Sequence, residues 1–403
     1  MAVVAVLPHP SPAVSSMPGL RAVPMSEYAR FLEGSSRDLA RARTPAERLH
    51  LDIFLIAPML AIMVMGLFVL FSASDSDWDT VNRQIRNFVI GYGVFLVVAQ
   101  VRPDTLQRWA PALYLGALFL LLLVPFVGVG SKGAQRWLSL GVIRFQPSEI
   151  MKIAMPLAVA AWVVRPGLPP RPSVTLTALL IIGFPAAAIA TQPDLGTAIL
   201  VAASGGFVVF MAGISWWQLL SGALAALACI WPAWLFLLRD YQKQRILTLF
   251  DPDADRLGAG WNIIQSKTAI GSGGWSGKGW LEGTQSQLDF LPESQTDFII
   301  AVLAEELGFR GVLVLLLLYG LVVIRGLWIS FTAQTSYGRL LASAITLTFC
   351  VYVIVNMGMV AGILPVVGVP LPFVSFGGTS IVTLLLGFGI LSAISTEKRI
   401  ISQ

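Results

Sequence analysis

Asp297 is the residue of this chain best suited, by type and position, to do chemistry. It lies where the polar stretch 239–296 ends and an apolar run beginning at Phe298 follows. An ionisable residue at such a junction is costly to desolvate, which makes it a candidate site. A carboxylate there could act as a general base at the boundary between water and membrane. It could instead be a stabilising acid in the first turn of the next helix, capped by Thr296, where the helix dipole favours negative charge.

Glu149 and Lys152 form a second candidate pair at the start of another apolar run. Residues three apart share one face of a helix, so the two side chains are expected to meet. One interpretation is a local salt bridge that lets two charges enter an apolar environment. The other is that Lys152 helps to hold an anionic group while Glu149 orients it. The residues alone leave both interpretations open.

Further acids and bases follow Asp297 along its run. Glu305 lies on the same predicted helix face, about 12 Å farther along the axis at 1.5 Å per residue. Glu306 and Arg310 are four residues apart, a spacing that predicts an internal ion pair. We therefore expect those two charges to neutralise each other inside the helix.

Several cations lie in the segments that connect the apolar runs. Such residues are usually solvated or bind anionic lipid headgroups. If the ligand were a lipid diphosphate, some of them would neutralise the departing diphosphate, with or without a divalent cation such as Mg²⁺ or Mn²⁺. The candidates are Arg136, Arg144, Arg245, Lys267 and Lys278.

No protein-held metal site is predicted. The two histidines, His9 and His50, lie outside the apolar runs, which excludes a histidine site in a membrane-embedded region. Asp251, Asp253 and Asp255 have the spacing of a calcium loop, but Pro252 and the lack of later ligands argue against one.

The elements that position these residues follow from composition. The chain has 403 residues, of which 56% are hydrophobic and only 12% charged. A soluble protein has about a quarter of its residues charged, so this chain belongs in a bilayer. About 20 apolar residues cross the hydrocarbon layer. Ten runs qualify, the second and sixth being short: Ile53–Ser72, Phe88–Gln100, Ala112–Val129, Ser148–Val164, Val174–Ala190, Thr197–Ala212, Trp216–Leu238, Phe298–Ile324, Leu340–Ile363 and Thr379–Ile394.

The predicted fold is therefore an all-α integral membrane protein of about ten transmembrane helices. With the N-terminus inside, the tail, the inner connections and the C-terminus carry fourteen Lys and Arg, against five in the short outer connections. The positive-inside rule then places both termini in the cytoplasm and the loop 239–297, between the seventh and eighth spans, outside. Residues 1–48 are predicted to form a disordered cytoplasmic tail, and 49–403 the membrane domain. Basic residues that face outward do not indicate nucleic acid.

Two features of the outer connections are distinctive. Residues 362–378 are apolar but rich in proline and glycine, so they cannot form a regular helix. Irregular backbone near a membrane is tolerated where it lines a cavity, and we predict that role here. Within the long loop, Asp240–Phe250 and Trp261–Ile270 are predicted to be short helices that lie on the outer interface.

Taken together, these segments resemble the SEDS family of polytopic bacterial cell-wall proteins, and its RodA branch more than the division paralogue FtsW. The resemblance runs from about His50 to the C-terminus. Its motifs are Lys132-Gly-Ala-Gln-Arg-Trp137, Phe145-Gln-Pro-Ser-Glu149, Gln192-Pro-Asp-Leu-Gly-Thr197, Asp240-Tyr-Gln-Lys-Gln-Arg-Ile246, Gly283-Thr-Gln-Ser-Gln287, Leu291-Pro-Glu293 with Thr296-Asp-Phe298, Ala304-Glu-Glu-Leu-Gly308 and Gly368-Val-Pro-Leu-Pro372.

The resemblance implies a peptidoglycan glycosyltransferase that polymerises lipid II into a nascent glycan strand at the periplasmic face of the bacterial cytoplasmic membrane. It also implies a class B penicillin-binding protein, a transpeptidase, as partner. By position, the family's essential aspartate is Asp297 and its charged pair is Glu149 and Lys152. The reaction would invert the anomeric carbon. Arg136, Arg245, Lys267 and Lys278 would help to bind the substrate.

Two other functions remain open from the sequence. A lipid II flippase, which is a transporter, could use the charges in the predicted spans. However, the polar residues gather in the outer half of the predicted membrane domain, whereas a translocation path should have them at all depths. A scaffold that only recruits the penicillin-binding protein would need no chemistry at Asp297.

Overall fold

The structure is a computed structural model and describes residues 49–131, 134–139, 144–255, 258–287 and 293–397. The predicted tail, 1–48, lies outside the described residues. So do Lys132 and the Leu291–Pro292 part of the loop-end motif.

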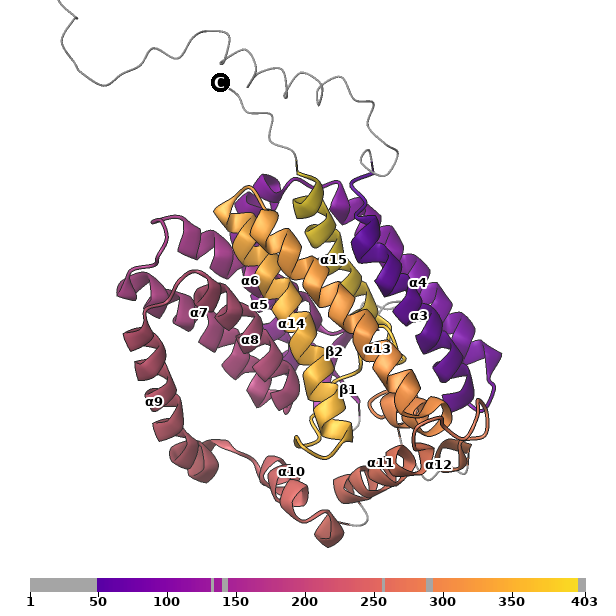
Figure 1. The fold of residues 1–403 in the computed structure, drawn as a ribbon. Helices are drawn as coiled ribbons and strands as arrows, with labels where there is room; N and C mark the ends of the chain where they lie inside the picture. Colours follow the sequence, from indigo (N-terminus) through magenta and orange to yellow (C-terminus); the bar gives the residue numbers. More distant parts are fainter. Residues whose placement is uncertain (1–48, 132–133, 140–143, 256–257, 288–292, 398–403) are drawn as a thin grey trace, which may run out of the picture. The chain divides into compact units, whose positions relative to one another are not determined.

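The described part of the chain is built almost entirely of helices, coloured along the sequence in Figure 1. They are α3 (Ile53–Ala73), α4 (Trp78–Ala99), α5 (Pro103–Val127), α6 (Pro147–Val164), α7 (Pro172–Thr191), α8 (Leu195–Met211), α9 (Trp216–Pro232), α10 (Asp240–Phe250), α11 (Ala259–Gly273), α12 (Thr284–Gln287), α13 (Ile299–Thr332), α14 (Ser336–Val360) and α15 (Thr379–Thr396). A π-helical turn, Ala233–Leu237, follows α9, and a 3₁₀ turn, Pro252–Asp255, follows α10.

Eight of these helical segments are long and apolar enough to cross a membrane, which confirms a helical membrane protein. The two weaker predicted spans correspond to α8, which has 17 residues, and to α4, whose first half is polar. The number of crossings therefore remains a prediction.

Local sequence signals explain where the helices begin. The Asp77 and Asp194 side chains accept hydrogen bonds from backbone N–H groups in the first turns of α4 and α8. Thr335 does the same for α14. Three further helices begin with proline, whose missing N–H costs nothing at that position: α5, α6 and α7.

The helices pack around one large apolar cluster. Among the described elements, α4 packs along α15, α5 along α6, and α13 against both α3 and α14. Gly389 lets α15 approach α4 closely, because a Cβ there would lie 2.8 Å from the Phe95 carbonyl oxygen. By contrast, no described residue of α9 is buried, which suits an apolar helix surrounded by lipid.

The all-α expectation needs one correction. The connection between α5 and α6 forms a small antiparallel sheet in the order β1 (Val129–Ser131), β2 (Ala134–Ser139) and β3 (Arg144–Phe145). Val129 pairs with Trp137, and Leu138 pairs with Phe145. Strands this short carry no clear alternation of polar and apolar residues, so periodicity does not reveal them. The sheet carries Arg136 at the centre of β2.

Helix α13 is interrupted at Gly308, where φ is 67° and ψ is −166°. The glycine-rich segment 274–279 lies in the break, and its backbone bonds to residues 305–310 with N–O distances of 2.9 to 3.3 Å. A Cβ on Gly277 would lie 2.0 Å from the Glu306 carbonyl oxygen, so only glycine permits this approach. The two backbones thus satisfy each other's polar groups where the helix cannot.

Two predictions for the outer connections are confirmed as secondary structure. Helices α10 and α11 cover the two predicted loop helices. Residues 362–378, all of them described, contain no helix or strand.

Candidate functional site

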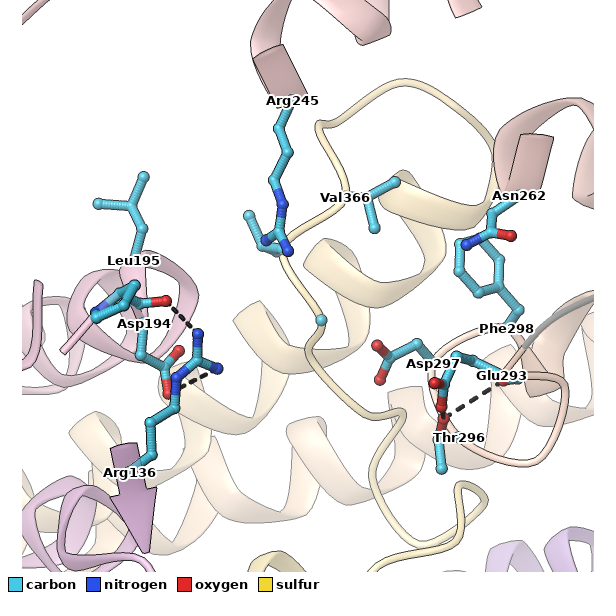
Figure 2. Close-up of a pocket in the computed structure, with 13 residues that line it drawn as sticks. Arg136, Asp194, Leu195, Arg245, Asn262, Glu293, Thr296, Asp297, Phe298 and Val366 are labelled. Carbon is cyan, nitrogen blue, oxygen red and sulfur yellow. Dashed lines mark hydrogen bonds and ion pairs between the residues drawn. The ribbon is translucent and has the colours of Figure 1, made fainter. Parts of the chain in front are cut away.

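A cavity of about 530 Å³ lies beside Asp297, and we call it the aspartate cavity. Its wall draws on segments distant in sequence, which meet in Figure 2. They are β2, the start of α8, helices α10 and α11, the loop 293–298 and the irregular segment 362–378. The predicted role of 362–378 in lining a cavity is therefore confirmed.

Asp297 does not lie in the first turn of a helix, so that expectation was wrong. Helix α13 begins at Ile299, its N-cap is Phe298, and no acid lies in its first turn. Residues 293–298 form turns instead, and the Thr296 hydroxyl donates to Glu293 Oε2 at 2.9 Å rather than capping the helix. This turn leaves the Asp297 carboxylate pointing into the cavity (Figure 2).

Gly368 forms the wall opposite the Asp297 carboxylate. Its φ is +71°, and a Cβ added there would lie 3.3 Å from Asp297 Oδ2. Glycine therefore serves two purposes here, since it adopts the left-handed backbone and leaves room beside the carboxylate.

Arg136 and Asp194 form the side of the cavity away from Asp297 (Figure 2). Arg136 Nη1 lies 3.8 Å from Asp194 Oδ2, and the guanidinium also donates to the carbonyls of Gln192, at 3.2 Å, and Pro193. Asp194 in turn accepts a hydrogen bond from Gln146 Nε2 at 3.0 Å. The predicted arginine thus bonds to the turn that starts α8.

A second cavity, of about 230 Å³, adjoins the first, and we call it the lysine cavity. Arg136, Asp194 and Gly368 line both cavities, so they form the partition between them. Glu149 and Lys152 lie in the lysine cavity. The two predicted halves of the site are therefore neighbours in space, although about 145 residues separate them in sequence.

The expected contact between Glu149 and Lys152 is present and buried. Lys152 Nζ lies 2.6 Å from Glu149 Oε1, with side-chain exposures of 8% and 10%. Thr383 donates to Glu149 Oε2 at 3.0 Å, and the ammonium lies 5.1 Å from the centre of the Tyr352 ring. Burial of both charges is tolerated because each has a partner.

The other predicted cations differ in position. Arg245 lines the aspartate cavity and points into it from α10 (Figure 2). Lys267 is exposed on α11 and lies beside Gly362. Lys278 pairs with the buried Glu305 at 2.6 Å. Neither lysine, nor the exposed Arg144, is among the described residues that line the two cavities.

The predicted ion pair between Glu306 and Arg310 was wrong. In the described part of the chain, Glu306 accepts a hydrogen bond from the Ser72 hydroxyl, and Arg310 lies over the Trp275 ring. The break at Gly308 falls between the two residues, so they do not have the geometry of residues four apart in one helix.

Three carboxylates line the aspartate cavity, those of Asp194, Glu293 and Asp297. Across the described ranges, however, no three acidic, histidine or cysteine side chains gather closely enough to hold a metal ion. Those three lining carboxylates therefore do not form a set of ligands for one cation.

Comparison with known proteins identifies the family. A family model described as "Cell cycle protein", which groups FtsW, RodA and SpoVE, matches residues 51–400. The chain belongs to the FtsW/RodA/SpoVE family. The matched range contains every residue of both cavities. This confirms the resemblance found in the sequence motifs.

Individual relatives of this FtsW/RodA/SpoVE protein are similar over nearly their whole length. The peptidoglycan glycosyltransferase MrdB of Escherichia coli (strain K12) is 51% identical over 367 residues, which cover 91% of this chain and 99% of the relative. A chain of a solved peptidoglycan synthase complex is 32% identical, with a TM-score of 0.75, covering 85% of this chain and 97% of that one. The rod shape determining protein RodA of Thermus thermophilus is 27% identical, with a TM-score of 0.65, covering 85% and 96%.

Three polar residues that line the aspartate cavity were missed as candidates: Asp194, Glu293 and Asn262. Asp194 and Glu293 were seen only as parts of motifs, although an acid close to the start of an apolar run was itself a signal. Asn262 of α11 lines the aspartate cavity and carried no signal, because a single amide in a polar loop is unremarkable.

Proposed function

We propose that this chain is a peptidoglycan glycosyltransferase that polymerises lipid II into glycan strands during cell elongation, with Asp297 as the general base. The observation that carries the proposal is the pair of adjoining cavities. One presents the Asp297 carboxylate and the other a buried lysine, with Arg136 between them. The 51% identity to a peptidoglycan glycosyltransferase supports the same activity.

The reaction requires one proton transfer and one leaving group. As Asp297 takes the proton from the 4-hydroxyl of a GlcNAc unit, that oxygen attacks C1 of MurNAc on the growing strand from the face opposite its diphosphate. The C1–O bond to undecaprenyl diphosphate breaks as the new bond forms, and the anomeric carbon is inverted. The leaving group needs no proton, so a second carboxylic acid is unnecessary. The proton on Asp297 passes to water.

Negative charge that develops on the diphosphate needs fixed cations nearby. Arg136 and Arg245 line the aspartate cavity, and Arg136 and Lys152 line the lysine cavity. We assign the diphosphate to the partition at Arg136, where it would lie within reach of both cavities. Lys152 is already paired with Glu149, so its contribution depends on that pair keeping the ammonium directed into the cavity. Lys267 and Lys278 line neither cavity and are not assigned to the substrate.

The arrangement in the membrane is part of the proposal. Ten crossings, with both termini in the cytoplasm and residues 239–297 outside, would expose the aspartate cavity to the periplasm, where lipid II is polymerised. Residues 1–48 would form a cytoplasmic tail attached to the membrane domain 49–403. The charge asymmetry of the connections supports this orientation.

A class B penicillin-binding protein is the proposed partner. The structural relative with a TM-score of 0.75 is a chain of a peptidoglycan synthase complex, in which polymerization and crosslinking are coordinated. A transpeptidase held beside this chain would crosslink strands as they are made.

The test is polymerisation of labelled lipid II by the purified chain together with its partner. Asp297→Asn keeps the shape and removes the base, and we expect a loss of about 10²- to 10⁴-fold in kcat. Asp251→Asn is the matched control, since this exposed acid of the same loop is not among the described lining residues of either cavity. A correctly folded Asp297→Asn protein that extends strands at the normal rate would refute the proposed role.

The same purified proteins and labelled lipid II distinguish a glycosyltransferase from a flippase and from a scaffold. Movement of lipid II across vesicles without polymer would indicate a flippase. Neither movement nor polymer, from folded protein bound to its partner, would indicate a scaffold. Strand synthesis that depends on Asp297 excludes both.

A further inference from the structure

Asn356 on α14 is fully buried and makes contacts unlike those of its polar neighbours. Its Nδ2 donates to the backbone carbonyl of Asp297 at 2.9 Å and to that of Val369 at 2.7 Å. The amide therefore joins the loop that ends at Asp297 to the irregular segment 362–378. Two carbonyl acceptors require a donor between them, which fixes the orientation of the amide.

The buried serine and threonine side chains of α14 bond only within the helix itself. Ser343, Thr346 and Thr348 each donate to a carbonyl three or four residues back, at 2.7 to 2.8 Å. Such bonds do not reach another element. Asn356 instead directs both amide hydrogens away from its helix and leaves Oδ1 without a hydrogen-bond partner. A buried unsatisfied oxygen is costly, so the two outward bonds are the reason to keep an amide there.

A second set of bonds joins the same two segments. The Ser375 hydroxyl donates to the Thr296 carbonyl at 2.5 Å and accepts from Leu371 N at 2.8 Å. Phe376 N donates to the Gln295 carbonyl at 2.9 Å. The three successive carbonyls from Gln295 to Asp297 are thus all held by α14 or by the segment that follows it.

The segment that holds Asp297 is itself anchored from other helices. Gln84 of α4 donates to the Ser375 carbonyl at 3.0 Å, and Tyr319 of α13 donates to the Pro372 carbonyl at 2.6 Å. Both side chains are buried. The support beneath the carboxylate therefore extends into the helical core and does not depend on the loop alone.

The position of Asn356 on its helix also relates the two cavities. Tyr352 lies four residues earlier, on the same face of α14. Its ring contacts Lys152 in the lysine cavity, while Asn356 holds the backbone of Asp297 in the aspartate cavity. One helix face thereby fixes the separation between the two ends of the site.

If Asp297 is the general base, as proposed above, the orientation of its carboxylate determines the rate. We propose that Asn356 is a positioning residue, which holds the Asp297 backbone so that its carboxylate meets the acceptor hydroxyl. It does not touch the substrate. Its removal should leave lipid II binding intact and slow the chemical step, because an error of about 1 Å in aim costs up to about 10²-fold in rate.

The experiment measures kcat and KM for labelled lipid II with the chain and its partner, comparing Asn356→Ala with Ser343→Ala. Ser343 is buried on the same helix but bonds only to its own helix, so it controls for the loss of a buried polar group. For Asn356→Ala we expect kcat to fall about 10- to 100-fold, with KM within about twofold of wild type. Ser343→Ala should change neither kcat nor KM.

Wild-type kcat in folded Asn356→Ala would overturn the inference, as would equal losses of kcat in the two variants. If Asn356→Ala does not fold, Ser375→Ala decides, because it breaks the neighbouring tie to Thr296. A selective fall in kcat supports the inference, and a wild-type kcat overturns it. Asp297→Asn is assayed alongside. If it polymerises as well as wild type, the proposed function fails. If it does not, and Asn356→Ala matches wild type, only the present inference fails.

Discussion

The buried pair of Glu149 and Lys152 offers a test that separates a structural role from a functional one. Lys152→Met alone would leave the Glu149 carboxylate about nine-tenths buried without its partner at 2.6 Å. Breaking a buried pair in this way costs about 3–5 kcal/mol of stability. The double variant Glu149→Gln with Lys152→Met removes both charges and keeps similar volumes. Thr383 can still donate to the glutamine oxygen, so we expect stability near that of wild type.

Activity should not recover with stability. If the ammonium stabilises the departing diphosphate, its loss costs about 10²- to 10³-fold in kcat, equivalent to about 2.7–4 kcal/mol. The assay combines thermal unfolding in detergent with polymerisation of labelled lipid II. We expect the single variant to be unstable and inactive, and the double variant to be stable and inactive.

A second ion pair, between the buried Asp52 and the partly buried Arg325, serves as the control. Arg325 Nη2 lies 2.7 Å from Asp52 Oδ2, where α3 begins, and neither residue is among the described residues of the two cavities. The double variant Asp52→Asn with Arg325→Met should retain polymerisation. If the variant lacking both Glu149 and Lys152 also polymerises at the wild-type rate, that pair is only a structural salt bridge and our assignment of Lys152 is refuted.

Two further substitutions test the rest of the site. Gly368→Ala places a methyl group 3.3 Å from Asp297 Oδ2 and imposes a left-handed backbone strain of about 1–2 kcal/mol. Steady-state kinetics should show kcat at least about tenfold lower. Unchanged kinetics would show that the carboxylate does not act from this position. Lys278→Met leaves the buried Glu305 without its ion pair, so the unfolding temperature should fall while KM for lipid II stays constant. A clear rise in KM would instead support the substrate-binding role that the sequence suggested for Lys278.

Much of the membrane architecture could be predicted from hydropathy, because a bilayer imposes one length and one polarity on every crossing. The contact between Glu149 and Lys152 followed from helical spacing alone, and the helix Asp240–Phe250 from its amphipathic pattern. These predictions succeeded because each depends on interactions within a single element.

Predictions that depended on contacts between elements were less successful. Asp297 was expected in the first helical turn. It lies outside the helix because residues 293–298 bond to one another and to the segment 362–378. The expected ion pair of Glu306 and Arg310 does not form because the glycine-rich segment 274–279 occupies the break at Gly308. Asn356 carried no sequence signal, since its importance comes from two carbonyls that are distant in the chain.

The break at Gly308 separates the longest helix into two parts with different roles. Residues 309–332 alone extend about 36 Å at 1.5 Å per residue, enough for a hydrocarbon layer of about 30 Å. Residues 299–307 are therefore not needed to cross the membrane. Two of them, Glu305 and Glu306, accept backbone hydrogen bonds from the glycine-rich segment 274–279, and the stretch follows directly after Asp297. We therefore expect a change in bilayer thickness to be accommodated by residues 309–332, without moving the Asp297 carboxylate.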